Sequence, residues 1–264
     1  MTSDVMRSLD PKIPLSANKP NFFLLGAGKC GTTSLASMLS QHPEVFMSTP
    51  KEPSFFCSYF QVTRDPISYF NLFSGCKNES AIGEASHVYF SNPETAATLQ
   101  LLFPDAKFIL ILRDPTLRAY SLYQWMHRYR FEALPTFESA LEAESVRYTD
   151  PEFFHNCPQY FWNFMYTRSS YYHIQWERYL RFFHRDRFFV LSLSELASDP
   201  VRWTQRIYEF LAVTGGFTPS TKHLNPGRYR EMQASTRKRL DEHFRPTIRA
   251  TRELAGRDMQ LGAL

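Results

Sequence analysis

Short apolar runs recur along the chain and end at turn-forming residues. Asn21–Leu25 (NFFLL) stops at a glycine, and Lys107–Leu112 (KFILIL) stops at an Arg-Asp-Pro turn. Continuous runs of this length are typical of strands that are buried on both faces of a parallel sheet. Further strand candidates are Val45–Met47, the weaker Ala81–Gly83, and Arg187–Leu191 (RFFVL).

Between these runs, apolar residues recur at helical spacing. Thr32–Gln41 and Tyr171–Phe183 carry apolar residues on one side, and Pro200–Leu211 and Ser235–Leu254 predict later helices. Pro246 is expected to kink or interrupt the last of these, because proline lacks an N–H donor. Strands that alternate with helices predict an α/β fold of three layers, in which helices flank one central parallel sheet.

The ends of the chain predict its organisation. Residues 1–20 are polar and contain three prolines, so we expect a flexible leader there and a single domain over residues 21–264. The leader has no signal-peptide pattern, and no stretch reaches the roughly 18 apolar residues that span a bilayer. We therefore expect a soluble cytoplasmic chain, with a secretory lumen as the alternative if a longer protein carries an anchor.

Composition narrows the class of protein only slightly. The 264 residues are 43% hydrophobic and 21% charged, which excludes disorder, a coiled coil and a collagen-like chain. A net charge of +4 gives a mild preference for anionic partners and is too small to indicate nucleic-acid binding. The four cysteines form no C-x-x-C pair, so we expect free thiols and no metal site. A disulfide in a secretory compartment is the competing interpretation.

The strongest candidate chemistry lies in the turn between the first strand and the first helix. Its sequence from Gly26 to Ser34, GAGKCGTTS, combines flexible glycines, a lysine, three hydroxyls and a helix start, which together form a cradle for a phosphate-like anion. This is not a Walker loop, because Thr32 stands where that motif has lysine. A structural turn with a solvated lysine is the alternative. The residues expected to bind the anion are Gly28, Lys29, Cys30, Gly31, Thr32, Thr33 and Ser34.

A second anion site is expected after the strand Lys107–Leu112. Arg113 ends this strand, and Ser121 follows eight residues later on the next helix. A forked guanidinium and a hydroxyl suit a phosphate monoester. Arg118 is expected to be a structural ion-pairing residue or a further anion contact, and Asp114 to cap the turn or helix. Because the carboxyl ends of parallel strands meet at one sheet edge, both sites should lie together.

The two motifs together resemble those of sulfotransferases that use 3′-phosphoadenosine 5′-phosphosulfate (PAPS). Lys29-Cys30-Gly31-Thr32-Thr33 matches the 5′-phosphosulfate loop, and Arg113 with Ser121 matches the pair that holds the 3′-phosphate. The resemblance implies a P-loop-like strand–loop–helix and an enzyme that moves the sulfuryl group in line, without a metal. It also implies that a late basic loop, here Gly227 and Arg228, closes the 3′-phosphate pocket; a surface turn is the alternative.

Motifs on the acceptor side narrow the resemblance to carbohydrate (heparan-type) sulfotransferases and their bacterial relatives. Lys51 opens the motif KEPSFF, and the resemblance implies that it lies near the donor sulfate or the acceptor. Glu84 lies five residues before Tyr89, the spacing from which the resemblance implies the catalytic base. His87 is the alternative base, since cytosolic relatives use histidine. Ala85 follows Glu84 where the family usually has lysine.

The acceptor is expected to be a glycan or a small molecule rather than a nucleic acid. The segment Met126–Tyr171 is rich in aromatic residues and is expected to form part of its cleft, while Tyr171 or Tyr172 is a candidate for contact with adenine. Two other functions stay open. A P-loop kinase or NTPase is disfavoured because the Walker lysine is replaced by Thr32, and a non-catalytic nucleotide-binding module is disfavoured by Glu84.

Overall fold

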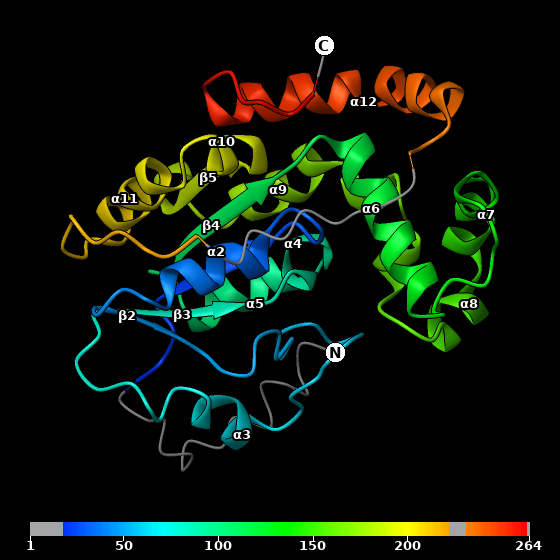
Figure 1. Ribbon diagram of the computed structural model, residues 1–264. Helices are drawn as coiled ribbons and strands as arrows, with labels where there is room; N and C mark the ends of the chain where they lie inside the picture. Colours follow the sequence, from blue (N-terminus) through cyan, green and yellow to red (C-terminus); the bar gives the residue numbers. More distant parts are fainter. Residues whose placement is uncertain (1–17, 222–230, 263–264) are drawn as a thin grey trace.

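Five parallel strands form one sheet in the order β2-β3-β1-β4-β5 (Figure 1). The structure is a computed structural model, and it describes residues 18–221 and 231–262. Two of the predicted strands, β2 and β4, have the predicted bounds, and the others differ by at most two residues at either end. The strands are β1 (Phe22–Gly26), β2 (Val45–Met47), β3 (Ala81–Ala85), β4 (Lys107–Leu112) and β5 (Phe188–Ser192).

The central strand β1 is buried along its whole length and contributes side chains to the hydrophobic cores on both faces of the sheet. Phe23 and Leu25 belong to the core on one face, and Phe22 and Leu24 to the core on the other. The ring of Phe22 occupies the space over Gly83 of β3, where a Cβ atom would lie 2.2 Å from the ring. Glycine at this position therefore lets a large aromatic residue pack in the middle of the sheet.

Helices cover both faces of the sheet, so the predicted three-layer α/β fold is confirmed (Figure 1). One face packs against α2 (Thr32–Leu39), α10 (Leu193–Ser198) and α11 (Pro200–Leu211). The other packs against α4 (Val88–Ser91), α5 (Thr95–Leu102), α6 (Pro115–Arg128), α9 (Tyr172–Leu180) and α12 (Ala234–Ala255).

The last helix, α12, is continuous through Pro246, so the predicted interruption does not occur. Proline removes one hydrogen bond from a helix and leaves the carbonyl of the residue four positions earlier without its partner. Here that residue is Glu242, and both Glu242 and Pro246 are exposed to water. The opposite face buries Leu240 and Phe244, and α12 packs against α6 and α9, which holds the helix in place.

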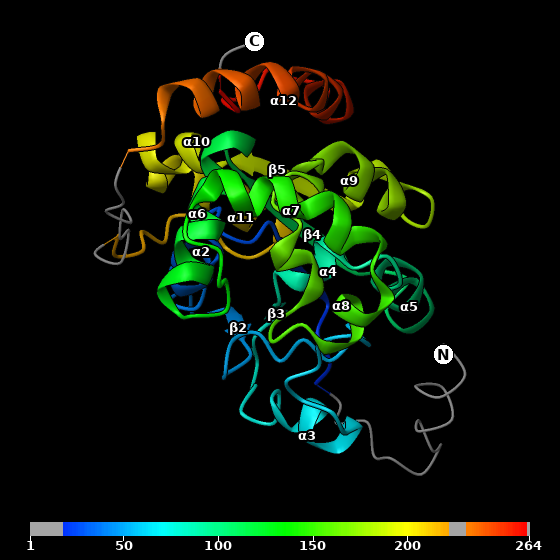
Figure 2. The same ribbon diagram turned by 90° about the vertical axis from the view of Figure 1, so that its right-hand side faces the viewer.

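The segment Met126–Tyr171 is more helical than its sequence pattern predicts. It contains the end of α6 and two further helices, which lie together at one side of the molecule (Figures 1 and 2). Its elements are α7 (Phe137–Thr149), α8 (Pro151–Asn156) and the 3₁₀ turns η1 (Phe161–Phe164) and η2 (Arg168–Ser170); α3 (Pro66–Asn71) and η3 (Arg185–Arg187) lie elsewhere.

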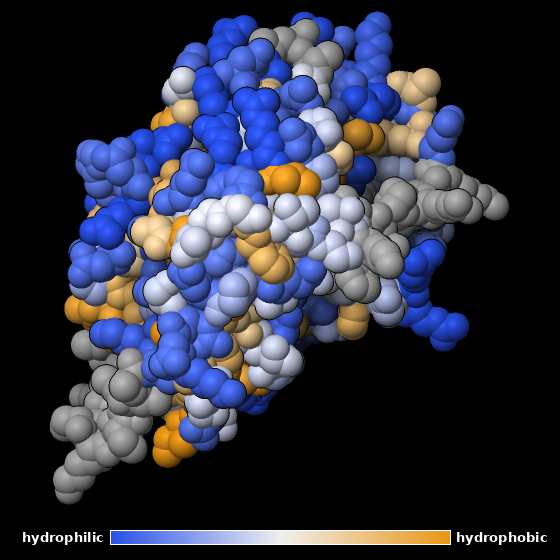
Figure 3. Space-filling view, turned by 60° about the vertical axis from the view of Figure 1, so that its left-hand side comes forward, coloured by the Kyte–Doolittle hydropathy of each residue, from blue (hydrophilic) through white to orange (hydrophobic). Residues whose placement is uncertain are grey.

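Some of the remaining sequence predictions can be compared with the structure, and others concern residues that it does not describe. All four cysteines are free thiols, as predicted. No helix within the described ranges is long and apolar enough to span a membrane. On the face shown in Figure 3, hydrophobic side chains are scattered in small groups among hydrophilic ones. The leader, apart from residues 18–20, and Gly227 with Arg228 lie outside the described residues, and the division into leader and single domain stays a prediction.

Candidate active site

The glycine loop between β1 and α2 has the geometry of an anion cradle. Gly26, Lys29 and Gly31 all have positive φ, at 141°, 69° and 91°, so the backbone turns back on itself over six residues. Gly31 is the N-cap of α2 and contributes no capping side chain. The first N–H groups of a helix have no partners within the helix, so they are available to an anion at this end.

The loop packs so closely against two other elements that a side chain on either of two glycines would displace a neighbour. A Cβ on Gly28 would lie 2.7 Å from Cδ2 of His87, and a Cβ on Gly31 would lie 2.7 Å from Cδ1 of Leu193. Real Cβ atoms essentially never approach other atoms that closely. The imidazole of His87 therefore lies directly against the loop.

Helix α6 joins the second predicted anion motif to the loop. Arg118 is 3% exposed, and its Nε donates a hydrogen bond to the carbonyl of Gly28 at 3.0 Å. The same guanidinium donates to the hydroxyls of Ser169 and Ser170 on η2. Arg118 is thus a structural residue, as one alternative predicted, but its hydrogen-bond partners are neutral groups.

Further along α6, the side chain of Lys29 reaches the ring of Trp125. The ammonium lies 5.6 Å from the ring centroid, within the range of a cation–π interaction. Arg113 is half-buried where β4 ends, and Ser121 is buried on α6. Asp114 caps α6 as predicted, since its Oδ1 accepts the N–H of Leu117 at 3.1 Å.

Cys30 stabilises the conformation of the loop through its backbone and its buried side chain. Its N–H donates to the carbonyl of Ala27, and its buried thiol lies 3.7 Å from the hydroxyl of Tyr172. Burial raises the pKa of this thiol, so it stays neutral. Tyr172 is 1% exposed and cannot stack on an adenine ring, so that candidate was wrong. Tyr171 instead makes a 2.7 Å hydrogen bond between its hydroxyl and Nε2 of His243.

Three charged or titratable side chains meet beside the loop in what we call the Lys51–Glu52–His87 cluster. Oε2 of Glu52 lies 2.8 Å from Nδ1 of His87, and Oε1 accepts a hydrogen bond from Lys51. All three side chains remain partly exposed. Burial alone raises the pKa of Glu52, but His87 and Lys51 outweigh it and hold that pKa well below its usual range.

Glu52 is the site residue that sequence reasoning missed. It has a positive φ of 66°, which is uncommon for a residue with a side chain, and its N–H donates to the carbonyl of Ala85 at the end of β3. This backbone contact aligns the loop after β2 with β3 and points Glu52 at His87. The only available signal was its place in the motif KEPSFF, next to Lys51.

Glu84 lies in β3 rather than at its end, and it is fully buried. One carboxylate oxygen accepts the hydroxyl of Ser86 at 2.5 Å, and the other accepts those of Tyr69 at 2.8 Å and Tyr89 at 3.2 Å. Burial raises the pKa of Glu84 to about 7, against the opposing effect of the three hydroxyls. Glu84 is therefore the centre of a buried polar network with Ser86, Tyr69 and Tyr89.

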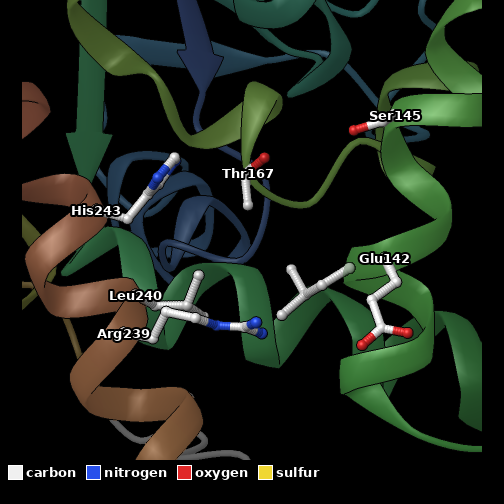
Figure 4. A pocket seen from close by; sticks show the side chains of 7 residues that line it. Glu142, Ser145, Thr167, Arg239, Leu240 and His243 are labelled. Atoms are coloured by element: carbon white, nitrogen blue, oxygen red, sulfur yellow. The ribbon is translucent and has the colours of Figure 1, made fainter.

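Two hollows are lined in part by the segment Met126–Tyr171, which was expected to contribute to the acceptor cleft. One, of about 250 Å³, separates α7 from α12 and is lined by Leu141, Glu142, Ser145, Thr167, Arg239, Leu240 and His243 (Figure 4). The other, of about 360 Å³, is largely aromatic and is lined by Tyr59, Pro93, Tyr148, Thr149, Asp150, Pro151, Phe154, His155, Phe161 and Trp162. Over residues 18–221 and 231–262, no three His, Cys, Asp or Glu side chains form a metal-binding group.

A glycine loop at the end of a central parallel strand, joined to a basic motif on the neighbouring strand's helix, is typical of α/β proteins that bind anionic ligands. Comparison with known proteins gives the family. The sequence matches the family model "Sulfotransferase domain" over residues 19–252, and the chain belongs to this family.

Relatives of this chain include bacterial and eukaryotic sulfotransferases. A sulfotransferase structure from Alicyclobacillus acidocaldarius is 34% identical, with a TM-score of 0.80 over 91% of this chain and 97% of that one. Human heparan sulfate glucosamine 3-O-sulfotransferase 6 is 25% identical over 99% of this chain and 80% of its own length. The membrane-associated sulfotransferase kil1 of Dictyostelium discoideum is 36% identical over 48% of this chain and 28% of its own length. The chain spans about a quarter of the length of the first curated relatives that it matches.

Proposed function

We propose that this chain binds PAPS and transfers its sulfuryl group to a hydroxyl or amine of an acceptor, releasing adenosine 3′,5′-bisphosphate (PAP). The observation that carries the proposal is the hydrogen bond from Arg118 to Gly28, which unites two anion motifs that lie far apart in the sequence. PAPS carries a phosphosulfate on the 5′-oxygen of its ribose and a phosphate on the 3′-oxygen. Such a donor needs two anion sites that are held at a fixed separation.

Each residue that binds PAPS then has a defined role. Lys29 and the N–H groups at the start of α2 bind the phosphosulfate and stabilise the negative charge that builds on its oxygens during transfer. The hydroxyls of Thr32, Thr33 and Ser34 add donors at the same end. Arg113 and Ser121 bind the 3′-phosphate, and no metal is required because the positive field comes from these groups.

Removal of the acceptor proton is assigned to the Glu52–His87 pair. A neutral His87 that donates Nδ1–H to Glu52 leaves Nε2 as the proton acceptor, and the carboxylate stabilises the imidazolium that forms. The close packing of His87 on Gly28 supports this role, because the ring lies beside the loop that is proposed to bind the sulfate.

The earlier prediction that Glu84 is the base has less geometric support. Its two oxygens already accept three hydroxyls, and none of its surface is exposed. We expect Glu52→Gln and His87→Gln to lower kcat by about 100-fold or more, the usual worth of a positioned base, and Glu84→Gln to retain most of the activity. Loss of activity in Glu84→Gln with full activity in His87→Gln would restore the original assignment.

The acceptor is proposed to be a carbohydrate or a small alcohol. A relative that aligns with nearly the whole chain is named for a glucosamine of heparan sulfate, which supports a sugar. Trp125 on α6 lies beside Lys29 and packs against the exposed Tyr129, the C-cap of that helix. Aromatic faces of this kind suit the apolar face of a sugar ring. The four free thiols fit a reducing cytoplasm, which we propose as the location.

The proposal is tested by incubating the full chain with ³⁵S-labelled PAPS and a panel of oligosaccharides, phenols and small alcohols. We expect label transfer that is lost in Lys29→Ala and that needs no added magnesium. The control is Lys238→Ala, which removes a lysine from the exposed face of α12. Hydrolysis of ATP with magnesium, without any binding of PAPS, would favour a kinase or NTPase instead.

A further inference from the structure

The carboxylate of Asp114 connects separate parts of the chain beside the candidate 3′-phosphate site. Asp114 follows Arg113 directly, and its Oδ1 caps α6 through the N–H of Leu117. Its Oδ2 accepts a hydrogen bond of 2.9 Å from Nη2 of Arg237, near the start of α12. Only 12% of the Asp114 side chain is exposed. The turn that presents Arg113 is therefore tied to α12 by a largely buried ion pair.

The tail that follows α12 reaches the same carboxylate. It turns back along the helix (Figure 1), and Arg252 holds it by hydrogen bonds to the carbonyls of Met259 at 3.0 Å and Gly262 at 3.3 Å. Met259 and Leu261 are buried, which anchors the tail against the core. Gly262 has a φ of 100°, and a Cβ there would lie 2.8 Å from Oδ2 of Asp114. The backbone of the tail thus packs directly on the carboxylate.

The guanidinium of Arg237 is fixed on both sides. Its Nε donates to both oxygens of Asp241, one turn further along α12, at 2.8 and 2.6 Å, while Nη2 donates to Asp114. Burial raises the pKa of Asp114, and the Leu117 amide and Arg237 oppose that rise. Without Arg237, a largely buried carboxylate would stand unpaired next to a site that binds a phosphate, and it would repel that phosphate.

We propose that Asp114, Arg237 and Gly262 form a latch through which α12 and the tail hold Arg113 in position for the 3′-phosphate of the donor. The inference rests on the proposed function, because that function assigns the 3′-phosphate to Arg113. Arg237 is a positioning residue that acts through Asp114 and does not itself touch the donor. The latch therefore sets the preference for PAP over AMP, which differs from PAP only by lacking the 3′-phosphate.

The experiment measures the dissociation constants of PAP and AMP by titration calorimetry, with the full chain and its variants. In Arg237→Gln we expect PAP to bind about tenfold more weakly and AMP to change by less than about twofold, the scale set by one charge-assisted hydrogen bond. Arg237→Lys should recover part of the loss. The matched control is Arg249→Gln, which removes an exposed arginine from the same helix and should leave both constants within about twofold.

Two further variants keep the outcome decisive. Gly262→Val presses on Asp114 from the tail and should cause the same selective loss of PAP, even if Arg237→Gln does not fold, which thermal unfolding will show. Equal weakening of PAP and AMP, or no change in either, overturns the latch. Arg113→Gln separates the two proposals: if it keeps the preference for PAP, the proposed function fails, whereas if it loses the preference and Arg237→Gln keeps it, only the latch fails.

Discussion

Glu84 makes the stability of the protein depend on pH in a direction that can be calculated. The pKa of this buried carboxyl is raised from its ordinary 4.5 to about 7, chiefly by burial. Between these two values the folded chain keeps the Glu84 proton, while the unfolded chain has released it. The contribution of Glu84 is therefore fully present below about pH 4.5, and it is lost as the pH rises towards 7.

The size of this contribution follows from the displacement of the pKa. Each tenfold change in proton affinity corresponds to about 1.36 kcal/mol, so the displacement from 4.5 to about 7 is worth about 3 kcal/mol. For a chain of this size, that amount moves the midpoint of thermal unfolding by about 6 to 12 °C. We expect Glu84→Gln to remove this dependence, because the amide has no proton to lose and its oxygen still accepts hydroxyls from Tyr69 and Tyr89.

The assay is denaturant unfolding and thermal unfolding of the wild type and Glu84→Gln between pH 4.5 and 8. The free energy of unfolding of the wild type should fall relative to that of the variant by about 3 kcal/mol across this range and then stay level. Glu242→Gln, which changes an exposed carboxylate on α12, should give a profile parallel to the wild type. Parallel profiles for the wild type and Glu84→Gln would refute the reasoning.

Three other changes test the packing of the glycine loop and of the sheet. Gly28→Ala should displace His87 and lower kcat at least tenfold with little effect on PAP affinity, which steady-state kinetics and calorimetry will separate; unchanged turnover would argue against His87 as base. Gly83→Ala should cost about 1 to 3 kcal/mol of unfolding free energy, because the new methyl overlaps the ring of Phe22, and denaturant unfolding measures this. Arg118→Lys should weaken PAP binding about tenfold, because one ammonium cannot span Gly28 and the two serines of η2; calorimetry showing wild-type affinity would contradict that role.

The sheet was predictable because most of its strands are continuous apolar runs, of which the first ends at a glycine and the fourth at an Arg-Asp-Pro turn. β4 is the clearest case: five of its six residues are fully buried, and its predicted bounds are those observed. Helices α7 and α8 were not predicted, because burial determines the apolar pattern and they bury very little. In α7 the buried residues are Phe137, Ala140 and Glu144, and α8 has none.

The site was predictable where local sequence determines its chemistry and not where tertiary contacts do. The loop from Gly26 to Gly31 carries its glycines and lysine in one stretch, so its role could be inferred directly. The role of Glu52 depends on a positive φ and on His87, which lies in another part of the chain, and neither can be read from a spacing. The orientation of Glu84 also depends on a tertiary contact. Glu84 of β3 pairs with Phe23 of the neighbouring strand β1 and lies on the same face of the sheet.

The position of the Lys29 ammonium over Trp125 has a practical consequence. Indole emission responds to a nearby charge, and two of the other three tryptophans, Trp176 and Trp203, are buried in the protein interior. In the proposed function Lys29 turns from the ring to a bound sulfate, which would change the electrostatic field on this fluorophore. Tryptophan emission is then expected to report donor binding and release in real time with unlabelled protein.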